Sequence, residues 1–166
     1  EDKDATPRVA LVHSFRRASS ELDAYALLDR PEFKLGNEAI LEEAVPESLK
    51  TMVAPSLGNG ESVQITTYEP NRVSIVVHAQ SPGLVVLSDT FYPGWKADVD
   101  GQEADIIRVN RVMRGVPVTA GRHTVEMTFM PRLFVIGGWI SLVAWMFMGV
   151  WGWRRHQRRK GMANGS

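Results

Sequence analysis

The sequence of 166 residues predicts a mainly β protein: an antiparallel β-sandwich of jelly-roll-like form, with one short N-terminal helix and one C-terminal transmembrane α-helix. Three observations lead to this prediction. Seven or eight short runs that favour strands lie at sandwich spacing before residue 130. A capping signal near the N-terminus marks a helix. Residues 133–153 then form an uncharged run of 21 residues, which as a helix would be roughly 30 Å long and match the hydrocarbon core of a bilayer.

The N-terminal part of the chain contains two candidate strands with a helix between them. Residues 8–13 are a short apolar run, and residues 38–43 form the second candidate strand. Ser20 is followed three residues later by an acid, and apolar residues then recur at helical spacing. Pro31 ends this helix at or before the preceding residue. Residues 46–60 are rich in proline and glycine, which predicts a loop.

The strand pattern becomes stronger from residue 62. Alternation of apolar and polar residues in the segments 73–79 and 124–129 predicts strands with one apolar face. The dipeptides Pro93-Gly94 and Asp100-Gly101 are turn signals, and the second is typical of a tight hairpin. The complete set of strands predicted in this part of the chain is 62–69, 73–79, 84–87, 104–109, 115–118 and 124–129.

Charge is distributed unevenly, although 19 basic and 19 acidic residues give a formal net charge of zero. Residues 1–132 hold 14 basic and 19 acidic side chains, a net charge of −5. Since basic residues stay on the cytoplasmic side of a membrane, we expect 1–132 to be an extracytoplasmic β-sandwich domain, 133–153 the transmembrane helix and 154–166 a basic cytoplasmic tail. The membrane-orienting residues are Arg154, Arg155, Arg158, Arg159 and Lys160. The zero net charge gives no reason to expect nucleic acid as a partner.

The chain has no cysteine and begins with Glu1, without a recognisable signal peptide. An exported domain without disulfides is ordinary in bacteria, so we expect a bacterial membrane protein. An extracytoplasmic domain needs an upstream segment to deliver it. We therefore expect either that a signal peptide has been removed or that the chain is the C-terminal part of a longer protein.

Few residues suggest chemistry. The four histidines share no metal-ligand spacing, and of these we expect His78 and His123 to be plain strand residues. Three aspartates within 98–105 suggest a calcium-binding loop, but the glycine and the glutamate of that motif are not at their required positions. A hairpin with solvated carboxylates is therefore favoured. No nucleophile elbow, phosphate loop or zinc-binding helix motif is present. We therefore predict no catalytic residue, no metal and no cofactor in this chain.

The segment 87–96 is the strongest candidate site. Its aromatic residues flank a Pro-Gly turn, with an acid and a base nearby, and aromatic rings beside polar groups are suited to hold sugar rings. The alternative is that Tyr92 and Trp95 cap the end of the sandwich core, because large aromatic side chains are mostly buried. Asp89 could act as a general base, but a hydrogen bond to the backbone of the turn is favoured.

A series of short motifs continues from this segment to the end of the domain. They are Ser88-Asp89-Thr90, Tyr92-Pro93-Gly94-Trp95, Val99-Asp100-Gly101, Arg114-Gly115-Val116, Ala120-Gly121, His123-x-Val125 and a proline, Pro131, before the last helix. In this order they resemble the C-terminal region of the bacterial YfhO family of polytopic membrane proteins. The opening residues 7–12, followed by an acidic helix, fit the same region, so the resemblance extends over residues 8–153.

The resemblance implies that the chain is a fragment. YfhO-like proteins have many membrane helices before an extracytoplasmic β-rich domain and a final helix, and they are similar to glycosyltransferases that use lipid-linked sugars to modify cell-envelope polymers such as lipoteichoic acid. Their catalytic carboxylate is expected in an early extracytoplasmic loop, to which nothing here corresponds. The implied function is a non-catalytic domain that packs against upstream transmembrane helices among membrane lipids. It would contact a cell-envelope glycan through Asp89, Tyr92, Trp95 and Arg114.

Two functions of other classes stay open. The chain could be a free-standing, single-pass membrane-anchored module that binds a wall polysaccharide or a partner protein, and a signal peptide directly upstream of Glu1 would favour that function. It could also be a hydrolase in its own right. The absence of paired carboxylates at a readable spacing argues against the hydrolase.

Overall fold

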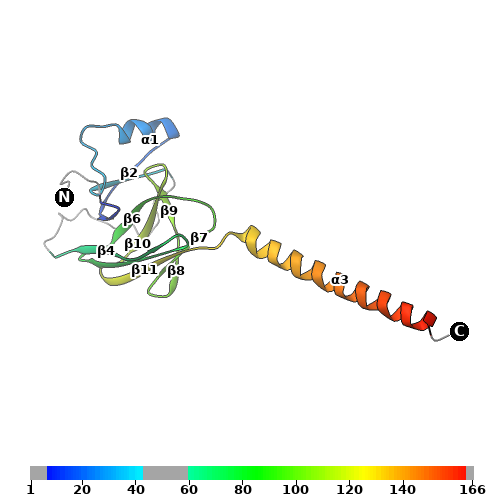
Figure 1. The fold of residues 1–166 in the computed structure, drawn as a ribbon. Helices are drawn as coiled ribbons and strands as arrows, with labels where there is room; N and C mark the ends of the chain where they lie inside the picture. Colours follow the sequence, from blue (N-terminus) through cyan, green and yellow to red (C-terminus); the bar gives the residue numbers. More distant parts are fainter. Residues whose placement is uncertain (1–6, 43–59, 164–166) are drawn as a thin grey trace. The chain divides into compact units, whose positions relative to one another are not determined.

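The chain forms two compact units, Glu1–Met130 and Pro131–Ser166. The computed structural model describes residues 7–42 and 60–163, and within the C-terminal helix it describes the side chains of 137–151 and 153. The first unit is mainly β, and in the described ranges its strands form two sheets (Figure 1). The prediction of a mainly β fold with two sheets is therefore confirmed.

The two sheets hold six and five strands. The first has the order β1 (Val9–Val12), β6 (Gly83–Thr90), β10 (Met113–Val118), β9 (Ile107–Val109), β3 (Glu38–Leu41) and β2 (Ser14–Arg17). The second has the order β4 (Ser62–Glu69), β5 (Arg72–Ala79), β11 (Gly121–Phe129), β7 (Trp95–Val99) and β8 (Gln102–Ala104). Strands β5 and β6 are joined by only three residues, 80–82, so the chain passes directly from one sheet to the other there.

One pair of strands departs from the predicted antiparallel arrangement. Strands β2 and β3 run parallel, with Ser14 opposite Glu38. The reason is the helix α1 (Glu21–Leu28), which lies between them in the sequence and acts as the crossover connection that parallel strands need. The helix begins as predicted, because the Ser20 side chain accepts a hydrogen bond from the Asp23 amide.

The predicted strand 104–109 is wrong as a single element. It is divided into β8 and β9, which lie in different sheets. The chain crosses between the sheets at residues 105–106. The pattern of apolar residues does not change at this crossing, so the sequence did not predict it. Strands β2 and β7 were not predicted, because their mixed polar composition hides the alternation. The predicted loop 46–60 lies outside the described residues except for Gly60.

Two clusters of buried side chains explain the continuous apolar run of β6. Val85 and Leu87 belong to the larger core, which also contains residues of β5 and β11 from the other sheet. Leu84 and Val86 point to the opposite face and belong to a second cluster with residues of β3 and β9. Because both faces of the strand are buried, every second position does not need to be polar.

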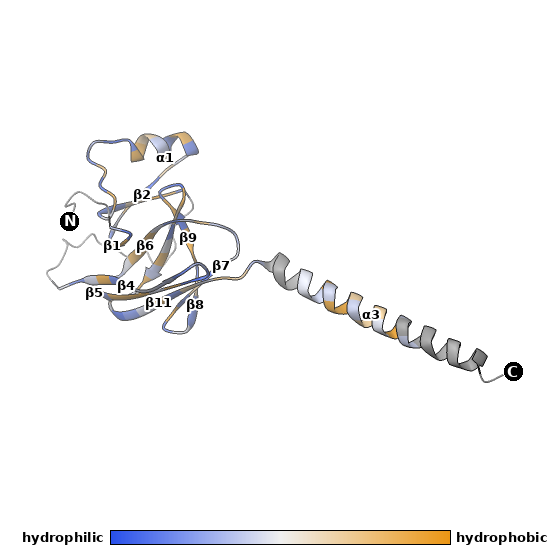
Figure 2. Ribbon diagram, in the orientation of Figure 1, coloured by the Kyte–Doolittle hydropathy of each residue, from blue (hydrophilic) through white to orange (hydrophobic). Residues whose placement is uncertain are grey.

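The second unit is the helix α3 (Arg132–Ala163). Its described large apolar side chains are exposed, among them Trp139, Phe147 and Trp153, and Figure 2 shows hydrophobic residues in the middle of this helix. Within the described part of the chain, no helix is long and apolar enough to cross a membrane, so the transmembrane helix predicted at 133–153 is not confirmed. The predicted orienting residues Arg154, Arg155, Arg158, Arg159 and Lys160 lie outside the residues whose side chains are described.

Candidate functional site

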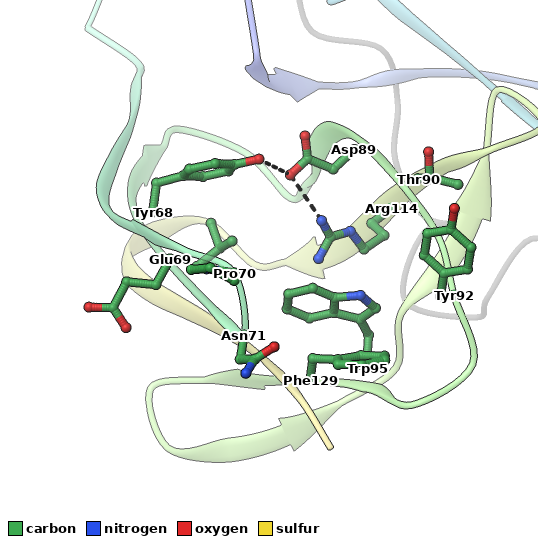
Figure 3. A pocket seen from close by; sticks show the side chains of 11 residues that line it. Tyr68, Glu69, Pro70, Asn71, Asp89, Thr90, Tyr92, Trp95, Arg114 and Phe129 are labelled. Atoms are coloured by element: carbon green, nitrogen blue, oxygen red, sulfur yellow. Dashed lines mark hydrogen bonds and ion pairs between the residues drawn. The ribbon is translucent and has the colours of Figure 1, made fainter. Parts of the chain in front are cut away.

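A pocket of about 470 Å³ lies in the first unit where several strands meet at one end. Strands β4, β6 and β11 end there, while β7 and β10 begin there. The pocket is lined by Tyr68, Glu69, Pro70, Asn71, Val73, Asp89, Thr90, Tyr92, Trp95, Arg114 and Phe129 (Figure 3). This set includes Asp89, Tyr92, Trp95 and Arg114, so the structure brings together all four residues that the sequence analysis selected.

Arg114 is the buried charged residue of this pocket, with a side chain that is 3% exposed. Its Nη2 donates to Asp89 Oδ2 at 3.0 Å, and its guanidinium carbon lies 3.9 Å from the centroid of the Trp95 ring. Nη1 contacts Met127 Sδ at 4.0 Å, and the buried Nε has no hydrogen-bond partner among the described residues. Burial lowers the pKa of the guanidinium and the Asp89 charge opposes that effect, but an arginine stays charged under these conditions.

Asp89 receives contacts from three other side chains. Its Oδ2 accepts hydrogen bonds from the Tyr68 hydroxyl at 2.9 Å and from Arg114 Nη2 at 3.0 Å, and its Oδ1 lies 3.4 Å from Arg8 Nε. The hydrogen bond to the Asp89 carboxylate, together with burial, raises the pKa of the Tyr68 hydroxyl. Asp89 thus bonds to neighbouring side chains, and among the described residues it makes no hydrogen bond to the backbone of the turn, contrary to the favoured interpretation.

Tyr92 and Trp95 have different surroundings, although the sequence treats them alike. Trp95 packs against the larger core, and Figure 3 shows its indole between the Arg114 guanidinium and Phe129, whose ring centroid is 5.4 Å away. One face of the indole is thus covered by Arg114, and Phe129 packs beside it with the two ring planes tilted by 44°. Tyr92 is 59% exposed, so its ring is open to solvent.

Several polar side-chain groups that line the pocket have no hydrogen-bond partner among the described residues. They are the hydroxyls of Thr90 and Tyr92, the amide of Asn71 and the indole N–H of Trp95. Figure 3 shows the indole nitrogen on the side of the ring that faces Tyr92. Polar groups that line a pocket and lack internal partners are available to orient a ligand.

The sequence analysis missed Tyr68 and Arg8. The Arg8 guanidinium carbon lies 4.4 Å from the centroid of the Tyr68 ring, and both residues contact Asp89. The sequence contained a weak indication that Tyr68 belongs to the site, because it is an aromatic residue at the end of a predicted strand. The sequence contained no indication that Arg8 belongs to the site, since its position depends on the pairing of Val9 with Leu87 across the sheet.

Two histidines outside the pocket have partners that the sequence did not reveal. His123 lies in a strand, β11, as predicted, and its Nδ1 lies 2.7 Å from Asp100 Oδ2 while its Nε2 lies 3.1 Å from Thr119 Oγ1. The buried His13 lies with Nδ1 2.9 Å from the Pro82 carbonyl and Nε2 3.1 Å from Glu61 Oε2. In the described ranges, no group of three or more histidine, cysteine or acidic residues could hold a metal ion.

Comparison with known proteins shows the family of the chain. A relative from Bacillus subtilis (strain 168), described as an uncharacterized protein YfhO, is 25% identical over 117 residues, which are 70% of this chain and 13% of the relative. The chain thus spans only a small part of that protein. No solved structure matches the chain. The family model described as "Bacterial membrane protein YfhO" matches residues 51–141, which is more than half of the sequence, and the chain therefore belongs to the YfhO family.

Proposed function

We propose that the chain is the C-terminal extracytoplasmic domain and last transmembrane helix of a YfhO-like membrane glycosyltransferase that modifies a cell-envelope glycan. The domain is non-catalytic in this proposal, and the reaction takes place in the preceding part of the protein. Family membership supports the proposal, as does the small share of the Bacillus subtilis relative that the chain spans. The partners are then membrane lipids, the upstream transmembrane helices of the same protein and the glycan.

The proposed membrane helix rests on the sequence of residues 133–153. This run has no charged residue, and five basic residues follow it within 154–160. Such an arrangement favours a spanning helix with its C-terminus in the cytoplasm, which would leave residues 1–132 outside. The description of the family as a membrane protein supports a location in the membrane.

The proposed role of the pocket is to hold the glycan. The observation that carries it is the exposed ring of Tyr92 beside polar groups that lack partners among the described residues. Proteins bind sugars by placing an aromatic ring against the apolar face of the sugar and polar groups against its hydroxyls. Asp89, Trp95 and Arg114 belong to the same proposed site, with Tyr92 as the residue most accessible to the sugar.

The test is a comparison of two exposed tyrosines in the full-length protein. Tyr92→Ala should lower glycan transfer to the cell envelope by about tenfold, since an aromatic anchor in a binding site contributes more than about 1 kcal/mol. Tyr25→Ala is the matched control, because Tyr25 is 55% exposed on α1 and does not line this pocket. Immunoblots must show equal amounts of both variants. Normal transfer by Tyr92→Ala would show that the pocket does not hold the glycan.

A further inference from the structure

We propose that the pocket binds an uncharged saccharide and that Arg114 is a positioning residue, which does not touch the ligand. This inference rests on the proposed glycan-binding function and gives that site a ligand class. It begins from the charges around the pocket. The pocket is lined by one basic residue, Arg114, and by two acidic residues, Asp89 and Glu69, and Arg8 outside the lining pairs with Asp89, so the formal charges of these four residues cancel.

The Arg114 side chain is 3% exposed, so little of its guanidinium is available to an anion. An arginine binds a phosphate or carboxylate through two parallel N–H donors on one edge of the guanidinium. Here Nη2 is paired with Asp89, Nη1 contacts Met127, and Nε is buried and inaccessible to solvent. One flat face is covered by the Trp95 indole. A ligand anion would have to break the Asp89 pair to reach this charge, and burying the anion without a partner is unfavourable.

The groups that remain open to a ligand suit hydroxyls. The indole N–H of Trp95 is only a donor, whereas the hydroxyls of Thr90 and Tyr92 and the amide of Asn71 can donate and accept. Sugar hydroxyls have the same double capacity. Figure 3 shows the Glu69 carboxylate pointing away from Arg114 and Trp95, so it adds no charge to the centre of the pocket.

Arg114 acts through its neighbours in this arrangement. Its ion pair holds the Asp89 carboxylate, which in turn accepts from Tyr68, and its stacking contact holds one face of Trp95 while Phe129 lies near the indole as well. The orientation of the Trp95 N–H therefore depends on the position of Arg114. The buried cation stabilises the wall of the pocket, and the ligand contacts the groups that this wall presents.

The experiment uses the full chain, solubilised in detergent and labelled, on an array that carries neutral and acidic bacterial surface oligosaccharides. The acidic set bears phosphate or uronate groups. We expect binding to neutral oligosaccharides, with an affinity that changes less than about twofold when salt is raised from about 50 to about 500 mM. Binding should fall about tenfold in Tyr92→Ala. The Arg16→Met variant, which removes an exposed cation outside the pocket, should bind the same neutral oligosaccharides within about twofold of the unchanged chain.

The outcomes separate this inference from the proposed function. Binding to acidic oligosaccharides alone, with a strong loss at high salt, would overturn the neutral ligand while leaving a glycan-binding site in place. Binding to neutral oligosaccharides that survives in Tyr92→Ala would locate the ligand elsewhere and overturn both proposals. No binding to any oligosaccharide on the array would also overturn both.

Discussion

Arg114 is kept inside the domain by a small set of specific contacts. A buried ion needs both a charge partner and hydrogen bonds to compensate for lost hydration. Asp89 supplies the charge and the Trp95 ring supplies an electron-rich face. The pair is shared with Tyr68 and Arg8, which gives Asp89 further donors. Removing one member should therefore cost more than removing an exposed ion pair.

The first prediction concerns this buried pair. Arg114→Met should lower the free energy of unfolding by roughly 3 kcal/mol, because the methionine leaves the largely buried Asp89 carboxylate without its closest cation. Urea unfolding of the detergent-solubilised chain measures the change. Arg108→Met is the control, since the 3.7 Å pair of Arg108 with Glu42 is more exposed, and its effect should stay within about 0.5 kcal/mol. Equal stability of both variants would mean that the buried Arg114–Asp89 pair does not stabilise the fold more than an exposed pair does.

The second prediction concerns the space beside His13. A Cβ at Gly83 would lie 2.8 Å from His13 Cε1 and 2.8 Å from Leu11 Cδ1. Gly83→Ala should therefore destabilise the domain by about 1–3 kcal/mol, because the His13 ring is fixed between Glu61 and Pro82. Gly149→Ala adds the same methyl group in α3 where nothing lies within 4 Å, and it should not destabilise the chain. Wild-type urea midpoints for Gly83→Ala would contradict this packing.

At the scale of elements, the hairpin between β7 and β8 shows how a local signal is used in tertiary structure. Asp100 and Gly101 have φ values of 53° and 78°, and a two-residue turn with both values positive favours an Asp-Gly sequence. The Asp100 carboxylate forms its hydrogen bonds with another strand, β11. Its Oδ1 accepts from the Thr124 amide at 2.8 Å and its Oδ2 bonds to His123, so the turn is fixed to β11.

The third prediction is a pH dependence of stability from this contact. The Thr124 amide, and after it the His123 side chain, lower the pKa of Asp100 in the folded protein. A carboxyl group whose folded pKa lies below its unfolded value of about 3.9 stabilises the fold above that pH and loses this contribution as pH falls. The stability gap between the unchanged chain and Asp100→Asn should therefore be largest above about pH 5 and shrink toward about pH 3. Urea midpoints across this range measure it, and a constant gap would contradict the assignment.

The elements also show what the sequence could predict and where prediction failed. The segment 62–69 was predicted from its β-branched residues and the segment 73–79 from its alternation of apolar and polar residues, and both form strands. The split of 104–109 between two sheets was missed, because a strand crossing changes neighbours without changing composition. Within the site, the aromatic residues beside the Pro-Gly turn could be selected from the sequence alone. The contact of Arg8 with Asp89 joins residues far apart in the sequence and depends on sheet pairing.

At the scale of the whole molecule, the proposed topology can be tested because the chain has no cysteine. The fourth prediction uses two single-cysteine variants, Ser62→Cys in the exposed start of β4 and Ser166→Cys at the C-terminus, each expressed behind a signal peptide in bacteria. A membrane-impermeant maleimide should label position 62 on intact cells and position 166 only after permeabilisation. Labelling of position 166 on intact cells would contradict the topology.

The measurement that tests the central claim most directly is an NMR titration of the tryptophan indole N–H signals. The full chain in detergent is titrated with a neutral oligosaccharide that binds on the array, and the Trp95 signal is assigned with Trp95→Phe. The four tryptophans of α3, Trp139, Trp145, Trp151 and Trp153, serve as internal references. If the pocket holds the sugar, the Trp95 signal shifts in proportion to saturation and the four reference signals stay in place. Saturable binding that leaves the Trp95 signal unmoved would show that the glycan is held outside the pocket formed by Tyr92, Trp95 and Asp89.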